Sequence, residues 1–538
     1  MCAEGSRPGG TDVPGAPRII DRMKAPGSWR RARGTSRSIV GAGRVVAGTV
    51  RAFVGTCLAV LGGGFTVPAA AGGAVPTVDA LPAPVAAALQ RAQLPPEALV
   101  AWVAEVGPQA ALPRLAHRAR EPVNPASLTK LYTTGAALEM LGPAWTWTTP
   151  LLATGPIEGG VLRGDLAIQG RGDPSLVVER VWLMLRQLRQ RGVQEVRGDI
   201  VLDGRGFAAG DADPAAFDGE RFRPYNVQPD ALLLNLKSIT LGFVPDAARG
   251  VARVTADVVL AGVQVDAEVP LAPGDCGDWR GALKADFADP ARLRLAGRYP
   301  ASCGEKAWPI AYADPASYNA RLVEGLWREL GGRLAGKVRE GAVPAGAQPL
   351  FEFASPPLAA VVRDINKFSN NVMAQQLFLT LGATFAPPPA DAAPTDGSAA
   401  ARRVLAAYVA DRIGCSEPEL RIDNGSGLSR RALSSAHCLG AWLQALWASP
   451  VLPELMASLP VGGVDGTARR AGRLWGVGLG RTHLKTGSLR DTAGLAGYVL
   501  GASGRRYAFV AVLSHPNAQA GRPALDALVQ WAAEDQAP

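Results

Sequence analysis

The amino-acid sequence predicts an α/β body that is interrupted by β-rich insertions. Residues 77–141 combine helical stretches with an apolar strand candidate, ALVAWVAEV (98–106). From about 150 to 305 the chain changes to short apolar runs separated by Gly and Asp turns, which is typical of β-structure. The C-terminal part contains three further strand candidates, THLKTGS, LAGYVLG and RRYAFVAVLSH, followed by a helical stretch, ALDALVQWAAE, that can cover the resulting sheet.

The length and composition indicate a folded protein of several domains. The chain has 538 residues, which corresponds to about three domains at ~150 residues each. With 48% hydrophobic and 19% charged residues it can bury a large core. The net charge is +9, but residues 1–71 alone carry +7, so the remaining chain is almost neutral. The charge therefore does not favour a nucleic-acid-binding protein.

Residues 1–71 are predicted to be a signal peptide with an extended basic N-terminus. The basic stretch precedes an uncharged run, AFVGTCLAVLGGGFTVP (52–68), and then small residues. We expect cleavage after Ala71 and export to the periplasm. An uncleaved membrane anchor is the alternative, although the run is short and glycine-rich for a span of ~20 residues. Loose association with the membrane stays open, as does the oligomeric state.

Four cysteines remain after the predicted signal peptide: Cys276, Cys303, Cys415 and Cys438. An even number in an exported chain indicates disulfides, and pairing of sequence neighbours predicts Cys276–Cys303 and Cys415–Cys438. There is no C-x-x-C pattern and the four histidines are scattered along the chain, so we expect no zinc site.

The stretch 124–141 is predicted to be a helix. Asn124 is a good N-cap, Pro125 is a favoured first helical residue, and Gly142 can end the helix. Ser127 then lies in the first turn, where backbone N–H groups lack helical partners. Lys130 follows three residues later on the same helix face.

Serine and lysine at this spacing can form a nucleophile and its base. A serine hydroxyl attacks a carbonyl only when a neighbouring group takes its proton. Lysine can take that proton if burial or a second cation lowers its pKa, and free N–H groups of the turn can stabilise an oxyanion. The pattern S-x-x-K is nevertheless common by chance, and an ordinary capped surface helix is the alternative interpretation.

Two more polar motifs occur later in the chain. KFSNNVMAQQLFLTLG (367–382) is a helical pattern that opens on Ser369 and Asn371. HLKTGS (483–488) places Lys485 and Thr486 on a predicted strand, and Gly487 there allows close approach of a ligand backbone. Between them, APPPADAAPTDGS (386–398) is predicted to be a surface loop.

The three motifs S-x-x-K, S-x-N and K-T-G in this order are shared by penicillin-binding proteins and class A β-lactamases. The chain resembles the class C low-molecular-mass penicillin-binding proteins, the D-alanyl-D-alanine carboxypeptidase/endopeptidases, over nearly all of residues 75–535. The resemblance extends to four more segments: LAIQGRGDPSL (166–176), PYNVQPDALLLNLKSI (224–239), DNGSGLSR (423–430) and LPVGGVDGTARR (459–470).

The resemblance implies a penicillin-binding transpeptidase-like, β-lactamase-like catalytic domain of the α/β (α+β) class with two β-rich inserted domains. The catalytic domain would comprise residues 75–155 and 310–538, and the insertion residues 156–309. Within the insertion, one domain would take in about 156–230 with 290–309, and the other about 231–289. An insertion of this size between the first two motifs argues against a simple β-lactamase.

The resemblance also implies residue roles. Ser127 would be the nucleophile that forms an acyl-enzyme, and Lys130 its general base. Ser369 would relay a proton toward the leaving amine, and Asn371 would hold the peptide amide carbonyl. The middle residue of this second motif is Asn370, where related enzymes often have Asp.

In the third motif, Lys485 would add positive potential and keep Lys130 from holding its proton. Thr486 would bind the terminal carboxylate of the substrate beside Gly487. The backbone N–H groups of Ser127 and Ser488 would form the oxyanion hole.

These roles predict a periplasmic serine DD-peptidase that needs no cofactor or metal. It would trim the terminal D-Ala from peptidoglycan stem peptides, cut D-Ala–diaminopimelate cross-bridges, or both, and penicillin would acylate Ser127. Two alternatives remain: a serine β-lactamase or esterase, and a non-catalytic β-lactam-sensing wall-binding protein. The balance of carboxypeptidase and endopeptidase activity stays open.

Overall fold

The computed structural model describes residues 79–107, 112–207, 213–386 and 397–535. The predicted signal peptide, 1–71, lies outside these residues, as does most of the predicted surface loop 386–398. Within the described part of the chain, no helix is both long and apolar enough to cross a membrane.

A five-stranded antiparallel sheet forms the centre of the catalytic body, in the order β2-β1-β24-β23-β22. Its strands are β1 (Leu99–Glu105), β2 (Leu115–His117), β22 (Thr482–Leu489), β23 (Thr492–Leu500) and β24 (Arg506–Ser514). The N-terminal and the three C-terminal strand candidates therefore form one sheet. Successive residues of β1 point to opposite faces of the sheet and so enter different cores. One core contains Leu99, Ala101 and Val103, and the other contains Val100, Trp102 and Ala104.

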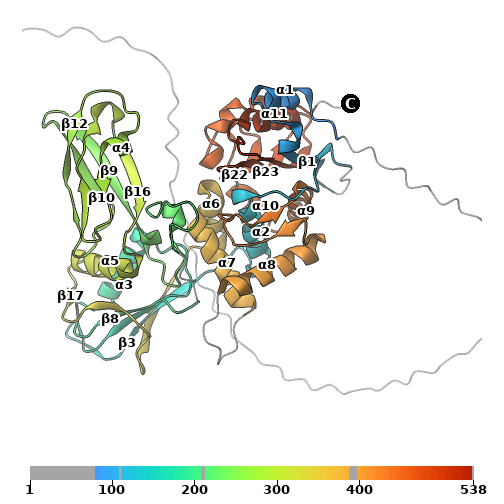
Figure 1. Ribbon diagram of the computed structural model, residues 1–538. Coiled ribbons are helices and arrows are strands. Elements are labelled where there is room, and N and C mark those ends of the chain that lie inside the picture. The colour runs from blue at the N-terminus through green and yellow to red at the C-terminus, as the bar shows by residue number, and fades with distance from the viewer. Residues whose placement is uncertain (1–78, 108–111, 208–212, 387–396, 536–538) are drawn as a thin grey trace, which may run out of the picture. The chain divides into compact units, whose positions relative to one another are not determined.

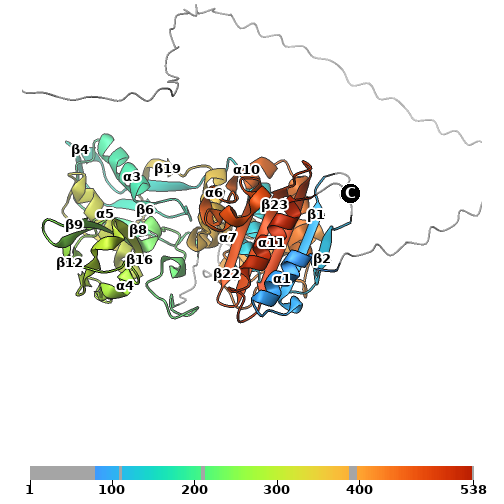
Figure 2. The ribbon, with the colours of Figure 1, turned by 90° about the horizontal axis from the view of Figure 1, so that it is seen from above.

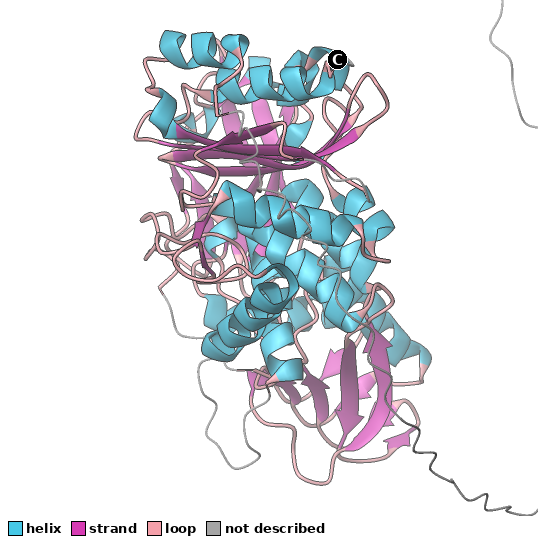
Figure 3. Ribbon diagram, turned by 90° about the vertical axis from the view of Figure 1, so that its right-hand side faces the viewer, coloured by secondary structure: helices cyan, strands magenta, loops and turns pink. Residues whose placement is uncertain are grey.

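Helices cover both faces of this sheet, which Figure 3 shows nearly edge-on. One core packs the sheet against α1 (Ala83–Arg91) and α11 (Arg522–Ala533). The other core contains residues of α2 (Lys130–Leu141), α6 (Leu358–Phe368), α7 (Asn371–Phe385), α8 (Gly397–Ile413), α9 (Ala436–Trp447) and α10 (Leu452–Ser458). Every residue of α2 from Lys130 to Leu138 is buried, so this helix is central and carries no solvent-facing side before its last turn. A small ladder of β20 (Leu420–Arg421) and β21 (Leu433–Ser434) completes the body.

The first inserted domain is built on a mixed sheet with the order β18-β8-β6-β3-β19. Its strands are β3 (Thr148–Ala153), β6 (Leu166–Gln169), β8 (Ile200–Asp203), β18 (Val338–Glu340) and β19 (Gln348–Ala354). A second sheet contains β4 (Ile157–Glu158), β5 (Val161–Leu162), β7 (Glu195–Val196) and β17 (Arg333–Leu334). Strands β6, β8 and β18 run parallel, and helices α3 (Val178–Gln190) and α5 (Pro315–Glu329) accompany them (Figure 2).

The second inserted domain is a β-structure around an aromatic cluster. It contains β9 (Ser238–Asp246), β10 (Val251–Ala256), β11 (Gln264–Val265), β12 (Glu268–Ala272), β13 (Ala285–Asp286), β14 (Arg292–Leu295), β15 (Tyr299–Pro300), β16 (Lys306–Ala311) and the short helix α4 (Trp279–Ala282). Phe243 stacks on Tyr299, with ring centroids 5.4 Å apart, and both contact Trp279 edge-on. The Cys276–Cys303 disulfide lies in this domain, as predicted.

The insertion differs from its predicted boundaries. One continuous core runs from Leu151 to Phe353, so β16, α5 and β17 to β19 belong to the insertion and not to the catalytic body that we expected from 310 onward. The chain leaves in β3 and returns in β19, and these strands pair with Thr148 opposite Ala354. The sequence predicted the helix α5 but not its packing partner, which is the core of the insertion. The helices α3 and α5 accompany the two sheets of the first inserted domain.

Candidate active site

The turn that carries Ser127 differs from the predicted helix start. Residues Ala126–Thr129 form a short 3₁₀ turn, and the α-helix α2 begins only at Lys130. Asn124 does not cap the helix: its Oδ1 accepts a hydrogen bond from the Ala126 N–H at 2.9 Å, and its Nδ2 donates to the Ser429 carbonyl at 2.8 Å. Ala126 has a φ of 49°, an unusual value for a residue with a side chain. The turn is thus held from both sides before the helix starts.

The ammonium group of Lys130 lies among three acceptors. Nζ donates to Ser127 Oγ at 3.0 Å, to Asn371 Oδ1 at 2.6 Å and to the Ser426 carbonyl at 2.6 Å. The side chain is fully buried. Burial, and then the charge of Lys485, hold the Lys130 pKa well below its usual value. A neutral amine next to Ser127 Oγ can accept the hydroxyl proton.

The second motif lies in the junction between α6 and α7. Ser369 adopts a left-handed conformation (φ 57°, ψ 37°) that ends α6, and Asn370 caps α7 by accepting from the Met373 N–H at 3.1 Å. Asn371 is the first residue of α7, which explains why it reaches Lys130. Because Ser369 ends one helix and Asn371 begins the next, the two side chains lie at the junction, where Ser369 contacts Lys485 and Asn371 contacts Lys130.

The third motif lies on β22, at the edge of the central sheet. Lys485 is fully buried, and its Nζ donates to Ser369 Oγ at 2.8 Å and to the Thr486 carbonyl at 2.7 Å. Burial lowers the Lys485 pKa to about 7. A Cβ on Gly487 would lie 3.0 Å from the Pro125 carbonyl oxygen, so glycine permits β22 to approach the turn that carries Ser127.

Thr486 and Ser488 lie on the same strand and have different partners. Thr486 Oγ1 donates to Thr467 Oγ1 at 2.8 Å. The Ser488 hydroxyl accepts from Arg522 Nη2 at 3.0 Å, so its side chain is already engaged. The structure therefore gathers all three motifs, from α2, the α6–α7 junction and β22, around Ser127.

The sequence profile of the D-Ala-D-Ala carboxypeptidase 3 (S13) family matches residues 81–535. The chain belongs to the D-Ala-D-Ala carboxypeptidase 3 (S13) family. The resemblance to low-molecular-mass penicillin-binding proteins is thereby confirmed, and this S13 chain is a serine-type D-Ala-D-Ala carboxypeptidase.

Two relatives of this S13 chain are carboxypeptidases. It is 27% identical over 388 residues to D-alanyl-D-alanine carboxypeptidase DacB of Haemophilus influenzae, covering 72% of this chain and 79% of the relative. It is 29% identical over 410 residues to the D-alanyl-D-alanine carboxypeptidase of Actinomadura sp. (strain R39), covering 71% and 72%.

Solved structures show the same fold. Penicillin-binding protein 4 (dacB) from H. influenzae matches with a TM-score of 0.64 and 24% identity, over 83% of this chain and 99% of that chain. The same protein complexed with a novel β-lactam matches with a TM-score of 0.61 and 23% identity, over the same shares. The expected penicillin-binding fold with inserted β-containing domains is thus confirmed.

Sequence reasoning missed the contribution of residues 424–427 in this S13 peptidase. Asn424 Oδ1 accepts from the N–H groups of Ser426 and Gly427, which closes a tight turn. Gly427 has a φ of +78°, and a Cβ there would lie 1.9 Å from the Ala126 carbonyl oxygen. The turn brings the Ser426 carbonyl to Lys130. The sequence DNGSG signals a turn, but nothing in it indicates that a main-chain carbonyl is the functional group.

The cleft beside this catalytic group is a cavity of about 350 Å³. Asn371 and Ser426 line it from the catalytic body, and Phe217 and Tyr225 from the insertion. Asn371 Nδ2 also donates to the Tyr225 carbonyl at 3.4 Å. The insertion therefore forms one wall of the S13 cleft.

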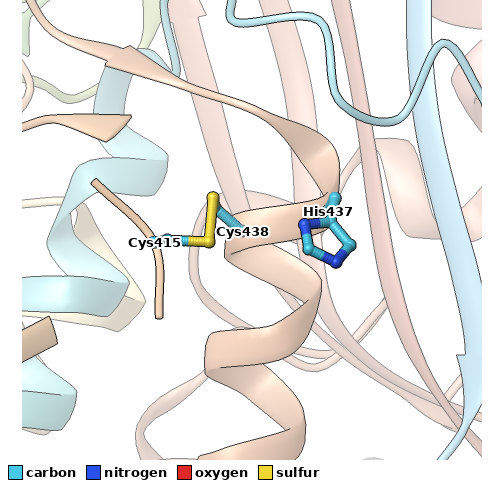
Figure 4. Close-up of side chains that lie close together, drawn as sticks. All are labelled: Cys415, His437 and Cys438. Atoms are coloured by element: carbon cyan, nitrogen blue, oxygen red, sulfur yellow. A yellow bond between two sulfur atoms is a disulfide. The ribbon is translucent and has the colours of Figure 1, made fainter. Parts of the chain in front are cut away.

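A separate cluster of Cys415, His437 and Cys438 has the composition of a metal site (Figure 4). The two sulfurs form the predicted Cys415–Cys438 disulfide, so neither is available as a thiolate ligand. The His437 pKa is lowered by burial and by the charge of Arg120. In this oxidised state the cluster is a structural cross-link between α9 and the segment that follows α8.

Proposed function

We propose that this S13 peptidase hydrolyses D-Ala-D-Ala peptides of peptidoglycan through an acyl-enzyme on Ser127. The observation that carries the proposal is the 3.0 Å hydrogen bond between Lys130 Nζ and Ser127 Oγ. A second buried lysine, Lys485, donates from its Nζ to Ser369 Oγ in the same site. The depressed pKa of Lys130 favours the neutral amine that a general base requires.

In the first half-reaction, neutral Lys130 takes the proton of Ser127 Oγ as the oxygen attacks the carbonyl carbon of the penultimate D-Ala. The N–H groups of Ser127 and Ser488 stabilise the oxyanion that forms. The C–N bond then breaks. Ser369 gives a proton to the leaving D-Ala amine, and the proton that Lys130 took from Ser127 replaces it on Ser369. Lys130 is thereby a neutral amine again, and the shortened peptide remains as an ester on Ser127.

In the second half-reaction, water attacks the ester carbon and gives up a proton to the same base. The Ser127–acyl bond breaks, Ser127 regains its proton, and the shortened peptide leaves as a carboxylate. Asn371 holds the amide carbonyl of the peptide during both steps. Thr486 and the charge of Lys485 bind the carboxylate of the terminal D-Ala.

The same chemistry extends to D-Ala–diaminopimelate cross-bridges, because the leaving amine there also sits on a D-centre that carries a carboxylate. We propose that the enzyme performs both reactions in the periplasm, after export directed by residues 1–71. Penicillin, whose strained amide reacts with the same hydroxyl, acylates Ser127. The complex of the H. influenzae relative with a β-lactam supports this inhibitor class.

A labelling experiment with reporter penicillin tests the nucleophile. Wild type is expected to form a lasting adduct and Ser127→Ala none, whereas the exposed serine variant Ser302→Ala labels normally. Undiminished labelling of Ser127→Ala would refute the assignment.

Digestion of purified muropeptides with mass readout tests the substrate. Loss of terminal D-Ala indicates trimming, and conversion of dimers to monomers indicates cross-bridge cutting. Rapid turnover of penicillin without either product would make the protein a β-lactamase, and labelling without turnover of any peptide would make it a β-lactam sensor.

A further inference from the structure

The insertion contains a second, larger cavity of about 920 Å³. It opens where the parallel strands β8 and β18 end: Gly204 follows β8, and Glu340 is the last residue of β18. The start of α5, at Pro315, closes it from another side. The carboxyl ends of parallel strands are the usual place for ligands in α/β sheets, and the volume suits a ligand of several rings.

This cavity shares part of its lining with the catalytic cleft. Both are lined by Asp213 and Pro214 and by the run Val227–Pro229. The residue after this run is fixed by α7, because Gln376 accepts from the Asp230 N–H at 3.0 Å and donates to the Asp230 carbonyl at 2.8 Å. The catalytic body thus sets the position of the segment that the cleft and the cavity share, and a long substrate that occupies the cleft would reach the cavity past this segment.

Two of the three cations that line the cavity are paired with carboxylates. Lys237 pairs with Asp230 at 2.6 Å, and Arg205 pairs with Asp203 at 2.9 Å. Glu340 lines the cavity as an exposed residue, so its carboxyl oxygens are available to hydrogen-bond a ligand. Partial desolvation and the neighbouring charge of Asp230 raise its pKa to about 7.

Apolar rings complete the lining. Phe207 and Phe222 contribute aromatic surface, and Pro214, Pro229 and Pro315 contribute flat aliphatic surface. A sugar ring presents the matching combination, with hydroxyl and acetamido groups around its rim and C–H groups on its two faces. In an ion pair the two charges offset each other, while their atoms stay available for hydrogen bonds. Such pairs suit an uncharged ligand with many hydroxyl groups.

We propose that this cavity binds the amino-sugar disaccharide to which the stem peptide is attached, so that glycan and peptide are recognised together. The inference rests on the proposed function, because it takes the occupant of the cleft to be a stem peptide. A second stem peptide fits less well, since its free carboxylates need unpaired cations. Within the described residues, Arg221 is the one cavity cation with no ion pair.

The test compares two substrates on the full-length mature enzyme: a pentapeptide attached to the disaccharide, and the same pentapeptide without sugar. We expect wild type to show a KM at least about tenfold lower for the glycosylated substrate. Arg221→Ala and Glu340→Ala should remove this preference and leave kcat/KM for the free pentapeptide unchanged. The exposed residues Arg253 and Glu305 supply matched controls as Arg253→Ala and Glu305→Ala, which should keep the preference.

Direct binding provides the second readout. With the cleft blocked by penicillin, the disaccharide alone should bind wild type in calorimetry and not bind the two cavity variants. Equal KM values for both substrates in wild type, or binding of a free stem peptide in place of the disaccharide, would overturn the inference. Failure of the proposed function would look different, because neither substrate would be hydrolysed while disaccharide binding could still be measured.

Discussion

Lys367 donates from its buried ammonium to Asp465 Oδ2 at 2.6 Å, and also to the Leu459 carbonyl at 2.6 Å. Lys367 lies two residues before Ser369, and Asp465 lies two residues before Thr467, which binds Thr486. The other carboxylate oxygen of Asp465 accepts from the Val461 N–H at 2.8 Å. This ion pair therefore ties the second motif to the loop that supports the third.

The Lys367–Asp465 pair predicts a positioning role that can be measured. Asp465→Asn should leave the buried ammonium without its charge partner, lower the free energy of unfolding by about 1–3 kcal/mol, and slow penicillin acylation roughly tenfold. Stopped-flow labelling measures the second effect. Asp364→Asn, at an exposed carboxylate of α6 that pairs with Arg363, is the control and should change neither quantity. Unchanged acylation in a destabilised Asp465→Asn protein would limit the pair to a structural role.

Gly427→Ala should displace the turn at 424–427 from the turn that carries Ser127. A Cβ would meet the Ala126 carbonyl oxygen at 1.9 Å, so the Ser426 carbonyl must move away from Lys130. We expect loss of penicillin labelling with a lowered melting temperature. Gly414→Ala is the matched control, because Gly414 also has a positive φ (+68°) but has open space around it. The control should lose about 1 kcal/mol of stability and keep full labelling.

The buried lysine of the third motif predicts how stability depends on pH. The Lys485 pKa falls from 10.5 when unfolded to about 7 when folded, so the unfolded state binds more protons between these values. Its contribution to stability is therefore present above pH 10.5 and is lost as the pH falls toward 7. The stability of wild type relative to Lys485→Met should rise from pH 7 to pH 10, as chemical unfolding at several pH values would show. A difference that does not change with pH would contradict the depressed pKa.

The Cys415–Cys438 disulfide should stabilise the catalytic body without serving as a metal site. The two cysteines are 23 residues apart in the sequence. Closing a loop of this size lowers the conformational entropy of the unfolded chain by an amount that corresponds to about 3 kcal/mol of stability. The double variant Cys415→Ser/Cys438→Ser should melt at a lower temperature, whereas a strong chelator should leave wild type unchanged. A chelator effect on oxidised wild type would show that His437 and its neighbours hold a metal after all.

The polar motifs could be read from the sequence because their chemistry is local. Ser127 and Lys130 are three residues apart on one turn, and Lys485 follows a strand pattern that the structure retains. The contribution of the Ser426 carbonyl could not be predicted in this way, since every residue has a carbonyl and only the fold selects one. The same holds for Thr467, which comes to Thr486 through the loop that Asp465 fixes.

The limits of the insertion were harder to predict than its existence. The texture of the sequence changes near 150, close to strand β3, but the boundary that we expected after residue 155 lies beyond the end of this strand at Ala153. The position at which the chain returns to the catalytic body could not be predicted. The amphipathic pattern of α5 is the same whether its apolar face packs on the catalytic sheet or on the inserted sheet. Its partner is decided by the long-range pairing of β19 with β3.

The pairing of β3 with β19 has a consequence for protein engineering. The chain departs after Trp147 and re-enters at Ser355, and the Ser355 N–H donates to the Trp147 carbonyl at 2.9 Å. Figure 1 shows the elements of the insertion, among them β3, β8, β9, β12 and β17, gathered together. Because the two ends of the insertion are hydrogen-bonded neighbours, a short connection would close the gap after its excision, and another module can be grafted at the same junction.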